Sequence, residues 1–84
     1  MPISSLEAAG KKTVGTKQTL KALEKGLAAE VFVASDAEQH VIKPLIQMCQ
    51  NKGIMVTNVD TMKNLGKACG IEVGCAVAAV IKDL

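Results

Sequence analysis

Glycine-punctuated alternation between helical and extended patterns is the feature that most constrains this 84-residue chain. Apolar residues recur at helical spacing in some segments and form short β-branched runs in others, with glycines between the two types. The predicted order is helix then strand, four times over. Strands that alternate with short helices require crossover connections, so we predict an α/β fold, a three-layer α/β/α sandwich with a small mixed sheet. Residues 1–84 should form one domain.

The N-terminal third of the chain contains two predicted helices around one short extended piece. A Ser-x-x-Glu capping box over residues 4–7 opens a short first helix. Residues 13–15 read as extended. A second helix follows, for which Thr16 is the expected N-cap and Gly26 the expected end.

The middle of the chain predicts a strand, a helix and another strand. Residues 30–35 form an apolar run of strand length, which should lie centrally in the sheet. Pro44 cannot donate a backbone hydrogen bond, so the next helix is predicted to start near Val41–Lys43. Gly53 should end it, and residues 54–59 should form the third strand.

The last third predicts a helix, a loop and a buried strand. Asp60 or Thr61 can cap the helix, residues 70–74 are a glycine-bounded loop, and residues 75–81 are the final strand. Gly66, Gly70 and Gly74 recur every four residues, but no Gly-Lys-Ser/Thr follows as a P-loop requires. We therefore interpret these glycines as ending a helix and shaping a tight loop.

Charge is concentrated near one end of the sequence. The net charge is only +2, yet residues 11–25 contain five lysines and one acid, Glu24. All ten basic residues are lysine, and Phe32 is the only aromatic residue. No apolar run approaches the ~20 residues of a membrane-spanning helix, and the N-terminus does not resemble a secretory signal. We expect a cytoplasmic protein that does not bind a membrane.

Neither the cysteines nor the histidine form a recognisable site. Cys49, Cys69 and Cys75 are odd in number and fit neither a disulfide framework nor zinc-ligand spacing, so we expect small buried residues. We predict no metal and no cofactor. A hydrolase using His40 and Asp36 is an alternative, but no nucleophile and orienting pair accompany them. The protein is not expected to be an enzyme.

The start of the second predicted helix, Gly15-Thr16-Lys17-Gln18 with Lys21 one turn later, is the best candidate binding site. Backbone N–H groups and the helix dipole favour anions there. Lysine can donate to guanine, glutamine can donate and accept along an adenine edge, and a second lysine can reach a phosphate. A solvated lysine face is the ordinary alternative explanation.

A second cluster strengthens this hypothesis. Lys63 and Lys67 share a helix face, with no acid between Asp60 and Glu72, and the following loop presents Ile71 and Val73. Two basic helices beside an apolar loop suit a bent RNA with unstacked bases. The near absence of aromatic residues argues against single-strand readers of the RRM or OB type.

The segments Gly15 to Leu23 and Leu65 to Val73 together resemble the kink-turn RNA-binding family named for ribosomal protein L7Ae, and most closely its short bacterial members. The resemblance covers nearly the whole chain and implies a three-layer α/β/α fold. It also implies that the helix start at Gly15, Thr16, Lys17 and Gln18 enters the kink-turn at its tandem sheared G·A pairs, where Lys17 and Gln18 read guanines.

The resemblance assigns further roles to the loop and to two lysines. The loop Ile71-Glu72-Val73 would pack against bulged nucleotides, with Val73 or Ile71 giving an apolar surface and Glu72 a base contact. Lys21 and Lys67 would hold phosphates. The expected partner is structured RNA containing a kink-turn, in ribosomal RNA or an mRNA leader, with the ribosome a candidate location and no DNA partner. Archaeal and eukaryotic members commonly carry Asn-Glu where this chain has Lys17-Gln18. The rival hypothesis is a protein-interaction module that uses the 66–74 surface without RNA.

Overall fold

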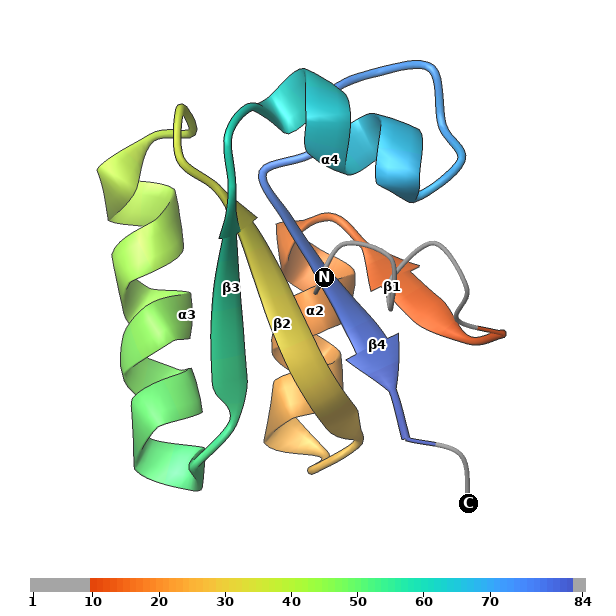
Figure 1. Ribbon diagram of the computed structural model, residues 1–84. Coiled ribbons are helices and arrows are strands. Elements are labelled where there is room, and N and C mark those ends of the chain that lie inside the picture. The colour runs from red at the N-terminus through yellow and green to blue at the C-terminus, as the bar shows by residue number, and fades with distance from the viewer. Residues whose placement is uncertain (1–9, 83–84) are drawn as a thin grey trace.

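The computed structural model describes residues 10–82, so the predicted helix near residues 4–7 lies outside the described residues. Its elements, in chain order, are β1 (Lys12–Val14), α2 (Thr16–Glu24), β2 (Ala28–Ala34), α3 (Gln39–Lys52), β3 (Met55–Val59), α4 (Met62–Ala68) and β4 (Val77–Ile81) (Figure 1). From residue 12 onward, the predicted alternation of strands and helices is confirmed.

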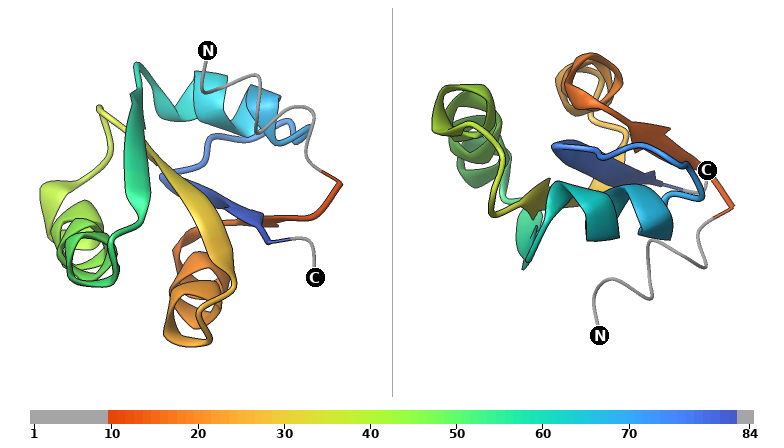
Figure 2. Two further views of the ribbon diagram at one scale, coloured as in Figure 1. Left: turned by 60° about the horizontal axis from the view of Figure 1, so that its bottom comes forward. Right: turned by 90° about the horizontal axis from the view of Figure 1, so that it is seen from above.

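The four strands form one mixed sheet in the order β1-β4-β2-β3. β2 pairs with β3 in parallel, whereas β4 pairs antiparallel with both β1 and β2. The central position predicted for the strand over 30–35 is therefore confirmed. Figure 2 shows α2 and α3 on one face of the sheet and α4 over the other, which is the expected three-layer mixed α/β arrangement.

An aliphatic core fills the space between the helices and the sheet. Phe32 and Val31 of β2 are completely buried, as are Leu23 of α2, Leu65 of α4 and Val77 of β4. These side chains bring all three layers together. The expected burial of the three cysteines is also confirmed. The hydrophobic effect supplies the main driving force for such an arrangement.

Two predicted helix starts were wrong. The N-cap of α2 is Gly15, whose carbonyl accepts the first helical hydrogen bond from Thr19 at 3.1 Å, so Thr16 is the first helical residue. One residue joins β1 to α2, and it needs a positive φ of 97°, which glycine adopts without the steric cost of a side chain.

The second wrong start is that of α3, which begins at Gln39 rather than within Val41–Lys43. Pro44 lies inside the helix on its exposed side. Only one intrahelical bond is lost there, and Ile42, Leu45 and Cys49 bury the opposite face of the helix. That burial outweighs the proline penalty of about 3 kcal/mol.

One end of the sheet collects the segments that contain the predicted site residues. The register pairs Ala34 with Val59 and Val33 with Val77, and it pairs Val14 with Ala78. The carboxyl ends of β1, β2 and β3 therefore lie together with the start of β4, at the upper end in Figure 1. The start of α2, the start of α4 and the loop into β4 all leave from this end.

Candidate nucleic-acid interface

The start of α2 is held against the first residue of β4. The Gly15 amide donates to the Val77 carbonyl at 2.9 Å, across a sequence separation of more than sixty residues. Lys17, Gln18 and Lys21 are exposed from this anchored helix start, whereas Thr16 is half-buried. The structure thus exposes three of the predicted side chains to solvent, on a helix start whose backbone is hydrogen-bonded to β4.

Gln18 is oriented by a hydrogen bond that sequence reasoning missed. Its Oε1 accepts from the Val14 amide at 3.2 Å, which links the first turn of α2 back to β1. Because a backbone N–H can only donate, the oxygen of the Gln18 amide must face Val14, and the N–H2 group is the end left to meet a ligand. The expected ability to accept from a base is thereby reduced, and Gln18 is mainly a donor.

The first turn of α4 is capped twice. Thr61, one of the two predicted caps, accepts from the Asn64 amide at 3.0 Å. Asp36 Oδ1 accepts from the Met62 amide at 2.8 Å, which ties α4 to the turn between β2 and α3. Since helix starts leave backbone donors without partners, both contacts stabilise α4 at this end of the sheet.

The loop over residues 70–74 folds back along α4 and is bonded to it at both ends. Ile71 donates to the Gly66 carbonyl and Cys75 donates to the Met62 carbonyl, each at 3.0 Å. The prediction that Gly66 ends the helix is wrong, because Gly66 lies within α4. Its role is to permit contact, because a Cβ there would overlap the Val73 carbonyl. Gly70, at a φ of 80°, follows the helix end.

The loop surface has one dominant apolar side chain. Val73 is 70% exposed, far more than Ile71, which packs partly against the core. Glu72 is also exposed. Of the two loop residues predicted to supply an apolar surface, the structure exposes Val73, whereas Ile71 packs partly against the core and helps to fix the loop.

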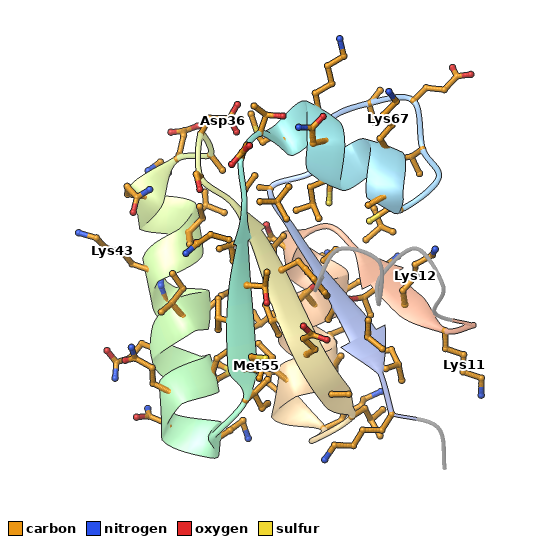
Figure 3. All side chains as sticks on the ribbon, in the orientation of Figure 1. Lys11, Lys12, Asp36, Lys43, Met55 and Lys67 are labelled. Atoms are coloured by element: carbon orange, nitrogen blue, oxygen red, sulfur yellow. The ribbon has the colours of Figure 1, made fainter. Side chains whose placement is uncertain are left out.

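Basic side chains lie near the start of α2 and the 70–74 loop. Lys63 and Lys67 are exposed on α4, and Figure 3 shows Lys67 beside the loop at the same end of the molecule as the start of α2. Lys43 points away from the opposite side, on α3, in the same view. Lys52 ends α3 just before β3 begins, at the other end of the sheet. The exposed side chains of the predicted site therefore lie on the surface of the molecule.

The alternative sites lack the contacts that chemistry requires. His40 and Glu38 lie 3.5 Å apart, but each side chain is 76% exposed, and Asp36 is occupied by the Met62 amide. Between residues 10 and 82 no cluster of three or more His, Cys, Asp or Glu residues is arranged to hold a metal. Nor does any helix in this part of the chain have the length and apolar character to cross a membrane.

Comparison with known protein families decides the assignment that the fold and the surface suggest. Residues 3–83 match the model of the ribosomal protein L7Ae/L30e/S12e/Gadd45 family. The chain belongs to this family. The resemblance seen in the residues of α2 and of the 65–73 segment is therefore confirmed.

Proteins from several organisms are similar to this chain. An RNA-binding protein of Caldanaerobacter subterraneus is 52% identical over 82% of this chain and 84% of its own length. Large ribosomal subunit protein eL8 of Halobacterium salinarum is 43% identical over 94% of this chain and 69% of its own. The solved structure of the Giardia lamblia 15.5 kD RNA-binding protein has a TM-score of 0.84 at 26% identity, covering 96% of this chain and 68% of that one.

Proposed function

We propose that this L7Ae-family protein binds structured RNA and recognises a kink-turn through the surface formed by the start of α2 and the 70–74 loop. The observation that carries the proposal is the hydrogen bond from Gly15 to Val77. It joins the helix start to the strand that the loop enters, which supports the proposal that the two motifs contribute to one surface. The RNA-binding names of similar proteins support the same conclusion.

Each part of the surface has a chemical role in this proposal. Lys17 and the N–H2 of Gln18 donate to the O6 and N7 acceptors of guanines at the sheared G·A pairs. Gly15 and Thr16 allow the RNA backbone to approach the helix start, where N–H groups favour phosphate. Lys21 and Lys67 neutralise phosphates, and Val73, with Glu72 beside it, covers the bulged nucleotides.

Binding of this kind requires no catalysis. A kink-turn RNA interconverts between extended and bent states, and a protein that contacts only the bent state shifts the population toward it. A rigid surface suits this task, since its own ordering costs little at binding. We place the activity in the cytoplasm, on ribosomal RNA or a structured mRNA leader.

The direct test is titration of a fluorescent RNA duplex that contains a kink-turn, beside the same duplex with its G·A pairs replaced by Watson–Crick pairs. We expect tight binding to the first duplex and much weaker binding to the second. Equal binding to both would mean charge attraction without recognition. Binding to neither would favour the rival hypothesis, a protein partner on the 66–74 surface.

A further inference from the structure

One polar side chain lies in the interior beneath the start of α2. Thr19 is completely buried, and it is the only buried polar residue between residues 10 and 82. Its hydroxyl is hydrogen-bonded to the hydroxyl of Thr13, which is half-buried on β1, and the two oxygens lie 2.8 Å apart. Apolar side chains of the same shape can replace such a pair with little change in stability. Burial alone therefore does not account for the two hydroxyls.

The hydroxyl pair adds to two other hydrogen bonds between the start of α2 and the sheet. The Gly15 amide donates to the Val77 carbonyl at 2.9 Å, and the Val14 amide donates to Gln18 Oε1 at 3.2 Å. The hydroxyl pair differs from these because it joins two side chains and is shielded from solvent on the helix side. The first turn of α2, which carries the exposed Lys17, is thus fixed from several directions.

We propose that Thr13 and Thr19 are positioning residues that set how deeply the start of α2 enters the RNA groove. The inference rests on the proposed function. Thr19 is buried, so it acts through the placement of α2 and does not itself contact RNA. The two hydroxyl oxygens lie 2.8 Å apart, whereas two carbon atoms in van der Waals contact lie about 3.5–4.0 Å apart. The hydrogen bond therefore holds the first turn of α2 about 1 Å closer to β1 than an apolar pair would.

A displacement of about 1 Å matters more for base contacts than for phosphate contacts. The amide group of Gln18 is tied to β1, so the position of its N–H2 group follows the position of the helix start. Hydrogen bonds from this group to a base weaken steeply when distance and angle change. Lysine side chains are flexible point charges and can still reach a phosphate. The hydroxyl pair should therefore strengthen recognition of the kink-turn and leave attraction to an ordinary duplex unchanged.

The experiment compares the loss of one hydroxyl with the loss of both. Thr19→Val leaves the Thr13 hydroxyl without its partner, and Tm should fall by about 4–8 °C. The double variant Thr13→Val with Thr19→Val replaces both hydroxyls by methyl groups, so most of the lost stability should return. Its affinity for the kink-turn duplex should nevertheless be about fivefold or more below that of the parent. Its affinity for the duplex with Watson–Crick pairs should equal the parent's.

Two further variants serve as references. Thr19→Ser keeps the hydroxyl and should keep the parent's preference for the kink-turn. Thr57→Val is the matched control, because Thr57 is half-buried on β3, at the opposite edge of the sheet from β1, and its hydroxyl donates to Glu30 Oε2 at 3.4 Å. The same substitution removes a hydroxyl hydrogen bond far from α2, so the affinity for both duplexes should not change.

Thermal unfolding followed by circular dichroism gives Tm, and titrations well below every Tm give the two affinities. The inference would be overturned if the double variant bound the kink-turn duplex as tightly as the parent. Equal weakening toward both duplexes, or the same weakening in Thr57→Val, would also overturn it. Should the double variant fail to fold, Thr13→Val and Thr13→Ser give the comparison at the half-buried position, where only the serine variant should keep the preference for the kink-turn.

A structural readout separates this inference from the proposed function. If the parent did not prefer the kink-turn duplex, the proposed function would fail. Amide hydrogen exchange would still decide whether the hydroxyl pair fixes the helix start. The amides of Gly15 and Thr19, which donate to Val77 and to Gly15, should exchange faster in the double variant than in Thr57→Val. Equal exchange rates in the two variants would show that the pair does not position α2.

Discussion

Gly66 of α4 lies directly against the Val73 carbonyl, with no room for a side chain between them. The contact is reinforced by the hydrogen bond from Ile71 to the Gly66 carbonyl at 3.0 Å. The backbone of Val73, the most exposed apolar residue of the loop, thus packs against the helix at a residue that has no side chain, and the Val73 side chain is exposed to solvent. A glycine inside a helix normally lowers stability, but here the absence of a side chain allows the loop backbone to pack against the helix.

Gly66→Ala should therefore displace the loop. Alanine favours a helix interior by about 1 kcal/mol over glycine, but the overlap with backbone at Val73 should cost about 1–3 kcal/mol or more. We expect a lower midpoint of chemical denaturation and weaker RNA binding. Gly10→Ala is the matched control, because a Cβ there meets nothing within 4 Å. Equal behaviour of the two variants would contradict the close packing.

Substitution of Gln18 should test the hydrogen bond that links the first turn of α2 to β1. Gln18→Ala loses the acceptor for the Val14 amide and should destabilise the protein by about 1 kcal/mol. Gln18→Glu keeps that acceptor and places a negative charge in the first turn of α2, so its stability should equal or exceed that of the parent. Thermal unfolding followed by circular dichroism measures both. A Glu variant as unstable as the Ala variant would refute a stabilising role for the hydrogen bond with Val14.

Lysines on the proposed surface should matter more than lysines elsewhere. Lys17→Ala should weaken binding of the kink-turn duplex by about 1–3 kcal/mol, or roughly 5- to 150-fold, because a base contact is lost. Lys43→Ala and Lys52→Ala, on α3 and at its end, should bind nearly as the parent does. Titrations at one salt concentration make the comparison. If all three variants lost affinity alike, the surface would be assigned wrongly.

Salt should weaken binding in proportion to the phosphates contacted. With about three or four phosphates neutralised, the slope of log K against log salt should be about −2 to −4. Lys21→Ala should make that slope shallower by about one. Titration of the parent and the variant across a salt series measures both slopes. An affinity that does not change with salt would argue against an electrostatic contribution.

Stability should fall in alkali through Cys69. The pKa of its thiol is raised from 9.0 to about 11 in the folded protein, so the unfolded chain loses its proton first as the pH rises. Its contribution to stability is complete below pH 9 and is lost between pH 9 and about 11. Cys69→Ser should show a smaller decline across this window. Denaturation at several pH values tests this, and parallel declines would assign the effect to other groups.

The order of elements was predictable because local patterns carry it. The apolar run of β2 and the glycines at the ends of helices marked the elements before any contact was known. Two helix starts were wrong because tertiary contacts set them. Gly15 is the N-cap because a single residue connects β1 to α2. Pro44 is tolerated because the opposite face of α3 is buried.

The candidate site was predictable in its residue types and not in its geometry. Lys17, Gln18 and the 70–74 loop could be chosen because a basic helix start and an apolar loop suit RNA. Nothing in the sequence indicated that Gln18 would bond to Val14. The relative exposure of Ile71 and Val73 was equally hidden, because both are apolar residues in the same loop.

From the sequence alone come the α/β class, the elements, the aliphatic core and the family, because periodicity, glycine positions and motif residues are local properties of the chain. The tertiary structure alone decided that Gly66 meets Val73 and that Gly15 and Cys75 share the Val77 carbonyl. The physical reason is that backbone groups carry no side-chain signal. These hydrogen bonds and close approaches join segments that are far apart in the sequence, and the residue types of one segment do not indicate which backbone group of the other it will contact.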